Sequence, residues 1–183
     1  MAKAESRLDE QELVAILMAY QAVQHASWPE LNPGSDRRAA AWATMSRSEL
    51  EAELRRLVAE TERPGKQVRV FWKIGADFVY GGCNDQFARD GGLRSAGDLI
   101  GKTDFDPALS WARQSAKYRK DDVEVVQSGR EKLDIIERQD GPSGTIWVRT
   151  GKAPIRVPGR KPIGILGMYE VIDGATAARL ARR

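Results

Sequence analysis

The chain contains almost no cysteine or histidine. Its 183 residues include one Cys, Cys83, and one His, His25. A single Cys excludes an internal disulfide framework and a multi-cysteine zinc site, and a single His excludes a His-rich metal site. Ser-His-Asp chemistry would have to use His25 alone. Because we find neither a metal cluster nor a nucleophile–base pair, we expect that the protein is not an enzyme and binds no metal.

Long apolar runs are also missing. The longest, such as residues 13–20 and 163–169, are far shorter than the roughly 20 residues that a membrane-spanning helix needs. The first residues carry charges of both signs and lack the apolar core of a signal peptide. We therefore expect no membrane span and a soluble, cytoplasmic protein in a reducing compartment.

Net charge is low, but it is unevenly divided. The formal net charge is +3, from 29 Lys and Arg and 26 Asp and Glu. Residues 1–65 carry 8 basic and 11 acidic residues, whereas residues 66–183 carry 21 basic and 15 acidic residues. The overall charge is too small to argue for nucleic acid, and Arg179, Arg182 and Arg183 at the end of the chain would make few phosphate contacts. We expect no nucleic-acid partner.

The sequence pattern changes at Arg63-Pro64-Gly65, which combines a helix stop with a turn. Apolar residues follow a helical period before this point, and β-branched and aromatic residues alternate after it. The change predicts a helical extension at 1–65, which is a possible dimerisation element, and a domain at 66–173. Residues 174–183 form either a basic tail or the start of an outgoing helix.

Two amphipathic helices are predicted in the extension. The first follows the capping pair Asp9 and Glu12, the second begins at Ser46, and a polar loop at 30–38 separates them. Their apolar stripes are Leu13, Ile16, Leu17, Tyr20 and Val23, and Leu50, Leu54, Leu57 and Val58. Neither helix can bury its stripe alone. The stripes therefore either pack on the following domain or form a seam shared with a second copy.

The second segment alternates between strand and helix patterns. Strands are predicted at 68–74 and 78–80, short helices at 85–90 and 96–100, a long helix at 111–127, and strands at 132–137, 145–150 (extending toward 156) and 163–172. Hairpin loops join the last three strands, which makes the sheet antiparallel. The predicted fold class is α+β, a five-stranded antiparallel sheet with helices on one face, preceded by the α-helical extension.

Short motifs follow one another in a characteristic order between residues 66 and 173. They are Phe71-Trp72-Lys73, Gly82-Cys83-Asn84-Asp85-Gln86-Phe87-Ala88, residues 99–106, residues 118–122, Ser128-Gly129, residues 146–150 and residues 162–169. In this order they resemble a PAS domain, the small sensory module of bacterial histidine kinases and cyclic-dinucleotide signalling proteins. The resemblance implies a PAS-like fold and a sensory role. It implies no particular ligand, because PAS domains share a scaffold and bind very different molecules.

The resemblance also indicates residues for signalling. PAS domains usually end their last strand with an Asp that pairs with a basic residue of a Trp-x-Arg strand. Trp147, Arg149 and Asp173 occupy the matching positions, although Gly174 ends the run without the usual hydroxyl residue. We expect an ion pair between Arg149 and Asp173.

The resemblance leaves the cofactor unknown. Light-sensing relatives carry a Cys in an Asn-Cys-Arg run within a helix, whereas Cys83 precedes Asn84 at the end of a strand, so photoactive flavin is disfavoured. Haem-sensing relatives usually supply an axial His, and no His follows residue 25, so haem is disfavoured too. We interpret the adjacent Asp121 and Asp122 as a solvated helix face, and Asp104 and Asp106 as capping residues.

A ligand pocket is predicted between the sheet and the helices. Candidates from the helical side are Phe87, Leu99, Phe105, Trp111 and Tyr118, and candidates from the sheet are Ile135, Ile146, Val148 and Leu166. A phase error of one residue in a strand would place its candidates on the opposite face. The alternative is that these residues form a solid core without a ligand.

The function expected from these observations is a sensory or signal-transduction module. It would bind a small ligand or a partner protein and relay the signal through helix packing or dimer geometry. The chain would be a homodimer that acts through a partner signalling protein or a fused output domain, either freestanding or cut from a larger sensor. The alternative function is a ligand-free structural scaffold for dimerisation or protein interaction.

Overall fold

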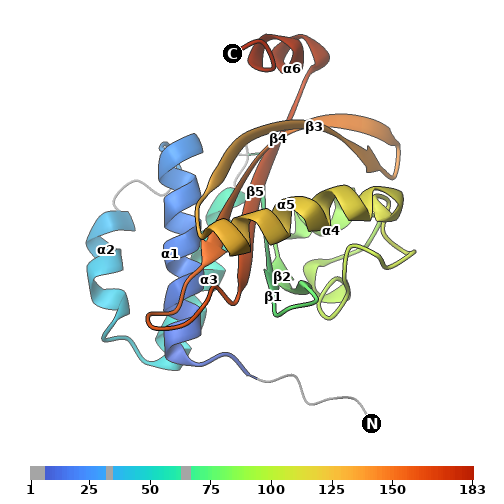
Figure 1. Ribbon diagram of the computed structural model, residues 1–183. Coiled ribbons are helices and arrows are strands. Elements are labelled where there is room, and N and C mark those ends of the chain that lie inside the picture. Colours follow the sequence, from blue (N-terminus) through green and yellow to red (C-terminus); the bar gives the residue numbers. More distant parts are fainter. Residues whose placement is uncertain (1–6, 32–34, 63–66) are drawn as a thin grey trace.

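The computed structural model describes residues 7–31, 35–62 and 67–183 (Figure 1). The boundary predicted at residues 63–65 lies outside the described residues. The elements in chain order are α1 (Glu10–Ser27), α2 (Ser35–Trp42), α3 (Arg47–Thr61), β1 (Val68–Ile74), β2 (Val79–Cys83), α4 (Asp85–Asp90), the 3-10 helices η1 (Ala96–Asp98) and η2 (Ala112–Gln114), α5 (Ser115–Ser128), β3 (Lys132–Gly141), β4 (Gly144–Ile155), β5 (Gly164–Ile172) and α6 (Gly174–Leu180).

The five strands form one antiparallel sheet in the order β2-β1-β5-β4-β3. In this order β5 lies between β1 and β4, with Met168 opposite Val70 and Tyr169 opposite Thr150. The strand that ends the segment therefore lies in the middle of the sheet, and β2 and β3 form its edges. This arrangement confirms the predicted α+β fold with a five-stranded antiparallel sheet.

Helices cover both faces of the sheet (Figure 1). The helices between β2 and β3 in the chain lie over one face, where α4 packs on β1 and α5 packs on β4 and β5. On the other face, α1 packs on β4 and β5, and α3 packs on β1. Each face has its own hydrophobic cluster, one around Leu17 and Met168 and the other around Phe87 and Ile165. The sheet is therefore the shared wall of two cores.

The apolar stripe of α1 is buried within the chain. The five predicted stripe residues of this helix are between 0% and 4% exposed, and burial of one Leu or Ile side chain contributes about 1.5–3 kcal/mol. The predicted caps are present, because the Asp9 carboxylate accepts a hydrogen bond from the Glu12 backbone N–H, and Ser46 and Glu49 form the same reciprocal pair. The sequence left two alternatives for the stripe of α1, which were packing on the following domain and a seam shared with a second copy. In the structure, this stripe packs on the following domain.

Helix α2 was not predicted from the sequence. It overlaps the segment 30–38 that we expected to be a polar loop. Long-range contacts hold this part of the chain, because Arg38 and Trp42 both donate hydrogen bonds to the Glu53 carboxylate on α3, and Trp42 is only 1% exposed. An eight-residue polar helix has too weak a local pattern to be recognised without these contacts.

Three further element boundaries differ from the predictions. The 3-10 turn η2 precedes α5, which therefore begins at Ser115 rather than at residue 111. Strand β2 extends to Cys83 and strand β3 to Gly141, because pairing with a neighbouring strand continues past the apolar residues. Among the described helices, none is both long and apolar enough to cross a membrane.

Candidate functional site

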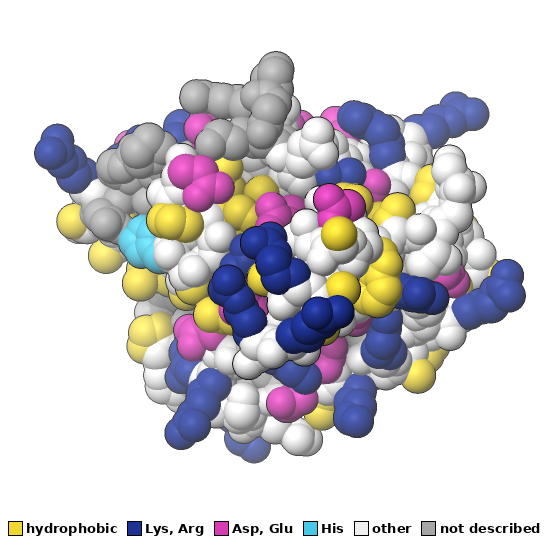
Figure 2. Space-filling model, turned by 90° about the horizontal axis from the view of Figure 1, so that it is seen from above, with side chains coloured by type: hydrophobic (Ala, Val, Ile, Leu, Met, Phe, Trp, Pro, Cys, Tyr) yellow, Lys and Arg dark blue, Asp and Glu magenta, His cyan; other side chains and the backbone are white. Residues whose placement is uncertain are grey.

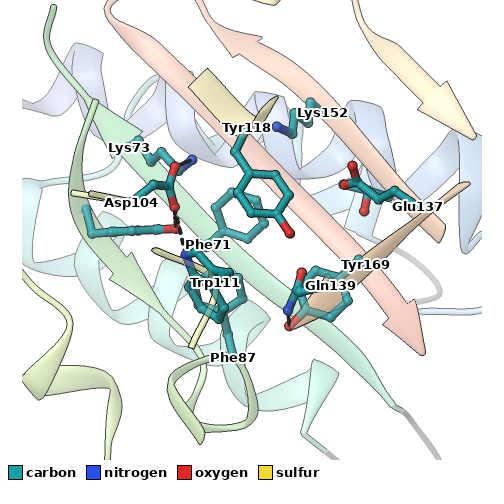
Figure 3. A pocket seen from close by; sticks show the side chains of 12 residues that line it. Phe71, Lys73, Phe87, Asp104, Trp111, Tyr118, Glu137, Gln139, Lys152 and Tyr169 are labelled. Carbon is teal, nitrogen blue, oxygen red and sulfur yellow. Dashed lines mark hydrogen bonds and ion pairs between the residues drawn. The ribbon is translucent and has the colours of Figure 1, made fainter. Parts of the chain in front are cut away.

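A small chamber lies between the sheet and the helices α4 and α5 (Figure 3). Its volume is about 20 Å³, which is room for about one water molecule. Its walls mix aromatic rings with charged and polar groups, and they consist of Phe71, Lys73, Tyr80, Phe87, Asp104, Trp111, Tyr118, Glu137, Gln139, Thr150, Lys152 and Tyr169. The mixture is unusual for a protein core, where charged side chains are rarely fully buried.

Two buried lysines and two buried aspartates meet at one end of the chamber. Lys73 of β1 forms ion pairs with Asp104 and, at 2.6 Å, with Asp122 of α5. Lys152 of β4 donates to the other carboxylate oxygen of Asp122 at 2.7 Å. Asp104 also accepts hydrogen bonds from the hydroxyl of Tyr80 and, at 3.0 Å, from the indole N–H of Trp111. All four charged residues are at most 2% exposed.

The electrostatic environment favours the charged forms of Asp122 and Lys73. Burial alone would raise the pKa of Asp122, but the ammonium groups of Lys73 and Lys152 outweigh burial and hold that pKa below its usual value. Burial would likewise lower the pKa of Lys73, but the carboxylates of Asp122 and Asp104 raise it. Oppositely charged neighbours thus offset the cost of burying Lys73 and Asp122.

The opposite end of the chamber holds Glu137 and Gln139 of β3. Burial raises the pKa of Glu137 despite an ion pair with Lys117 at 3.2 Å. The Gln139 amide donates to the hydroxyl of Tyr169 at 3.0 Å, and that hydroxyl donates to Asp90 at 2.5 Å. This end consequently offers an amide and a carboxylate that ionises less readily than usual.

Aromatic rings form the wall between the two ends. Phe87 of α4 stacks on Phe71 with 4.5 Å between ring centroids, and it lies 5.0 Å from Trp111 and 5.8 Å from Tyr169. Such ring pairs add about 0.5–1.5 kcal/mol each beyond the area that they bury. The wall is therefore a rigid surface that shields the charged cluster from water.

Three of the predicted pocket residues line this chamber, namely Phe87, Trp111 and Tyr118. Leu99, Ile146 and Val148 belong to the same hydrophobic cluster without lining the chamber. Ile135 is half-buried and does not line the chamber. Its partner across the strands, Thr150, does line it.

Two of the predicted pocket residues are elsewhere. Phe105 is 51% exposed, and its ring lies against the guanidinium of Arg119. Leu166 is buried in the cluster on the opposite face of the sheet, whereas Ile165 and Tyr169 face the helices around the chamber. The error arises because β5 is buried on both faces and its sequence has no polar alternation to set the phase.

The four charged residues of the chamber were not predicted from the sequence. Asp104 was interpreted as a capping residue and Asp122 as part of a solvated face, yet both are buried and bind lysines. The available signal was the presence of single lysines in apolar strands, Lys73 in β1 and Lys152 in β4. A charged side chain that is buried in such a strand requires a partner.

The predicted ion pair between Arg149 and Asp173 is absent. Arg149 binds Asp134 at 2.8 Å and Glu170 at 3.4 Å, because Glu170 is its direct neighbour across β4 and β5. Asp173 lies beyond the end of β5 and caps α6 by accepting a hydrogen bond from the Thr176 backbone N–H at 2.6 Å. Trp147 packs under the guanidinium of Arg138 at 4.8 Å.

Cys83, the free thiol, lies at the end of β2 and is 6% exposed. Burial raises its pKa to about 12, so the thiol is protonated at neutral pH. Within residues 7–31, 35–62 and 67–183, no group of three or more His, Cys, Asp or Glu is placed to hold a metal ion.

Comparison with known proteins shows which solved structures have a similar fold. No protein-family model matches the chain, and no curated protein matches it. A phage VqmA–DPO complex aligns with a TM-score of 0.56 at 20% identity, over 72% of this chain and 58% of that chain. A VqmA–ligand–DNA complex from Vibrio cholera aligns with a TM-score of 0.50 at 21% identity, over 61% of this chain and 53% of that chain. A PAS domain from Colwellia psychrerythraea aligns at 14% identity with a TM-score of 0.47, over 61% of this chain and 95% of that chain.

The chain thus spans between about half and three fifths of the length of these VqmA structures.

The expectation that nucleic acid plays no part is wrong as a general exclusion, because one of the similar structures is a complex with DNA. The small net charge of the whole chain was a poor guide to nucleic-acid binding, because one part of a surface can carry a charge that differs from the net charge. Lys and Arg side chains gather on the face of the molecule that Figure 2 shows. Arg179, Arg182 and Arg183, at the end of the chain, are exposed. At these levels of identity the comparisons concern the fold, and the resemblance to PAS domains found in the sequence is confirmed: this chain has a PAS-like fold.

Proposed function

We propose that the chain is a sensory module in which a small polar ligand binds in the chamber between the sheet and α5. The observation that carries this proposal is the cluster of Lys73, Lys152, Asp104 and Asp122 beside the cavity. Buried ion pairs contribute little to stability compared with apolar residues of similar volume, and strongly perturbed ionisable groups in a cavity are typical of functional sites. A ligand with both hydrogen-bond donors and acceptors would match these walls.

The size of the chamber sets the mechanism that we propose. A cavity of about 20 Å³ admits one water molecule, so a larger ligand must displace a side chain. Tyr118 is suited to this movement, because it lies on α5 and its hydroxyl donates a single hydrogen bond among the described residues, to Gln114 at 3.1 Å. Ligand binding would thus favour a different position of α5, and the populations of the two positions would carry the signal.

The output of the module is also a proposal. We infer a homodimer that transmits the change in helix packing to a partner or to a fused output domain. The VqmA structures indicate DNA as the output to test first, because one of them is a complex of ligand and DNA, and another is described as a dimer. The competing function is a structural scaffold that never binds a ligand and whose polar cluster serves only to fix the fold.

Native mass spectrometry separates these two functions. The purified protein would be incubated with a small-molecule extract of cells and sprayed under non-denaturing conditions, which reports bound mass and oligomeric state together. We expect a bound small molecule in the unmodified chain and none in Lys152→Met, because that substitution removes a cationic wall group.

The control for this experiment is Lys132→Met, which removes a half-exposed lysine outside the chamber. This variant should retain the ligand. If the unmodified chain carries no bound mass, the scaffold function is favoured. If Lys152→Met and Lys132→Met retain the ligand equally, the ligand binds elsewhere and the proposal is wrong.

A further inference from the structure

A second and larger hollow lies on the other face of the sheet. This groove of about 570 Å³ runs between α3 and the β1–β2 edge, and its size falls in the range of small-molecule pockets. Apolar groups form most of its surface, including Leu54 and Val58 of α3, Trp72 of β1, and Ile100. It shares no lining residue with the chamber.

Two glycines keep this groove open. A Cβ atom on Gly82 would lie 2.0 Å from the Trp72 ring, and one on Gly81 would lie 3.0 Å from the same ring. The indole therefore lies flat on the backbone of β2 and forms the floor of the groove. Larger residues at these two positions would lift the indole and fill the space.

The groove is lined by more cationic than anionic groups, namely Arg7, Arg47 and Arg55 against Glu51 and Glu62. Arg47, Glu51 and Arg55 lie one helical turn apart on the side of α3 that faces the groove. Arg47 is bound to Glu51 at 3.0 Å, and Arg7 lies 3.6 Å from the same carboxylate. Arg55 is exposed and has no ion pair within the part of the chain that the structure describes.

The floor of the groove also contains an unpartnered donor. Trp72 is 7% exposed, and among the described residues its indole N–H finds no hydrogen-bond acceptor. Buried donors of this kind usually have a partner. The groove thus combines an apolar bed with Arg55 at its edge, and the indole N–H of Trp72 in its floor reports on what occupies it.

We propose that this groove binds a single-chain amphipathic carboxylate, that is, a fatty acid of medium length. Its acyl chain would lie along Leu54, Val58 and Trp72, and its carboxylate would bind Arg55. A neutral apolar molecule would leave Arg55 without a partner. A second copy of this chain would need a protruding apolar surface that matches a concave one. An apolar hollow with an excess of cationic groups at its edge fits a small anionic amphiphile better.

Titration with sodium dodecanoate below its micellar concentration tests this proposal. The five Trp residues give separate indole N–H signals in a ¹H–¹⁵N spectrum, and Trp72→Phe assigns the signal of Trp72. We expect this signal to shift saturably with dodecanoate. Arg55→Gln should weaken binding about tenfold, which corresponds to the loss of one charge-assisted hydrogen bond, and dodecanol should bind more weakly than dodecanoate by a similar factor.

Two variants control the experiment. Ala59→Trp fills the groove from the exposed side of α3 and should abolish the shift, while unchanged dispersion of the other amide signals shows that the variant is folded. Arg113→Gln removes an exposed arginine outside the groove and should bind as the unmodified chain does. The proposal is overturned if dodecanoate does not bind, or if Ala59→Trp binds it normally. It is also overturned if the Trp72 signal shifts with protein concentration alone, because a second copy then occupies the groove.

Discussion

At the scale of single residues, Asp122 is the centre of the buried charges. It binds Lys73 at 2.6 Å and Lys152 at 2.7 Å and is 0% exposed. Asp122→Asn leaves two buried lysines facing one carboxylate, which should lower the free energy of unfolding by about 3–5 kcal/mol. Urea unfolding followed by fluorescence measures the change.

The neighbouring residue offers a matched control for this prediction. Asp121 pairs with Lys132, whose side chain is 35% exposed, so Asp121→Asn should cost at most about 1 kcal/mol. Equal losses in the two variants would show that Asp122 contributes no more than Asp121, whose side chain is 13% exposed and pairs with a partly exposed lysine. The interpretation of the cluster would then fail.

Glu137 gives the stability a pH dependence of opposite sign to that of Asp122. Burial raises the pKa of Glu137, so the folded state binds a proton more tightly than the unfolded state. Stability is therefore lost as the pH rises from the usual glutamate pKa of 4.5 through the raised folded value. Glu137→Gln should unfold at a higher urea concentration than the unmodified chain at pH 7, and the difference should vanish below pH 4.5. A difference that is constant with pH would contradict this assignment.

At the scale of elements, α1 belongs to the core. Leu17 is 0% exposed and its neighbour Met18 is 50% exposed, because adjacent residues point in different directions from the helix. Leu17→Ala should lower the free energy of unfolding by about 2–5 kcal/mol through loss of buried volume. Met18→Ala should change it by less than about 0.5 kcal/mol. Chemical denaturation of both variants checks the burial of α1, and a small effect of Leu17→Ala would mean that α1 is detached from the sheet in solution.

The elements also show what a sequence can predict. The caps and stripe of α1 were predicted because they depend on residues three or four positions apart. Helix α2 and the phase of β5 were not, because the first is held by Glu53 and the second is buried on both faces. The lysine cluster joins residues that are 31 and 49 positions apart, such as Lys73 and Asp122, and no local pattern contains that pairing.

At the scale of the whole molecule, the sheet couples the helices of the extension to the helices on its other face. The predicted division between 1–65 and 66–173 would allow two independent folding units. However, α1 and α3 cover one face of the same sheet whose other face carries the chamber. Removing the helices from either face would expose apolar residues of the strands, and both cores share these strands. We therefore expect the described elements to unfold as one unit.

Trp42 and Trp111 report on this coupling, because they lie in different clusters and are 1% and 2% exposed. With fluorinated tryptophan, each ring gives its own NMR signal, and Trp42→Phe and Trp111→Phe assign the two signals. We expect both native signals to disappear at the same urea concentration, and Leu17→Ala to lower both midpoints equally although Leu17 touches only the cluster of Trp42. If Leu17→Ala moved the Trp42 transition alone, residues 1–65 would be a separate domain, and a signal from the chamber could reach the extension only through a linker rather than through the shared sheet.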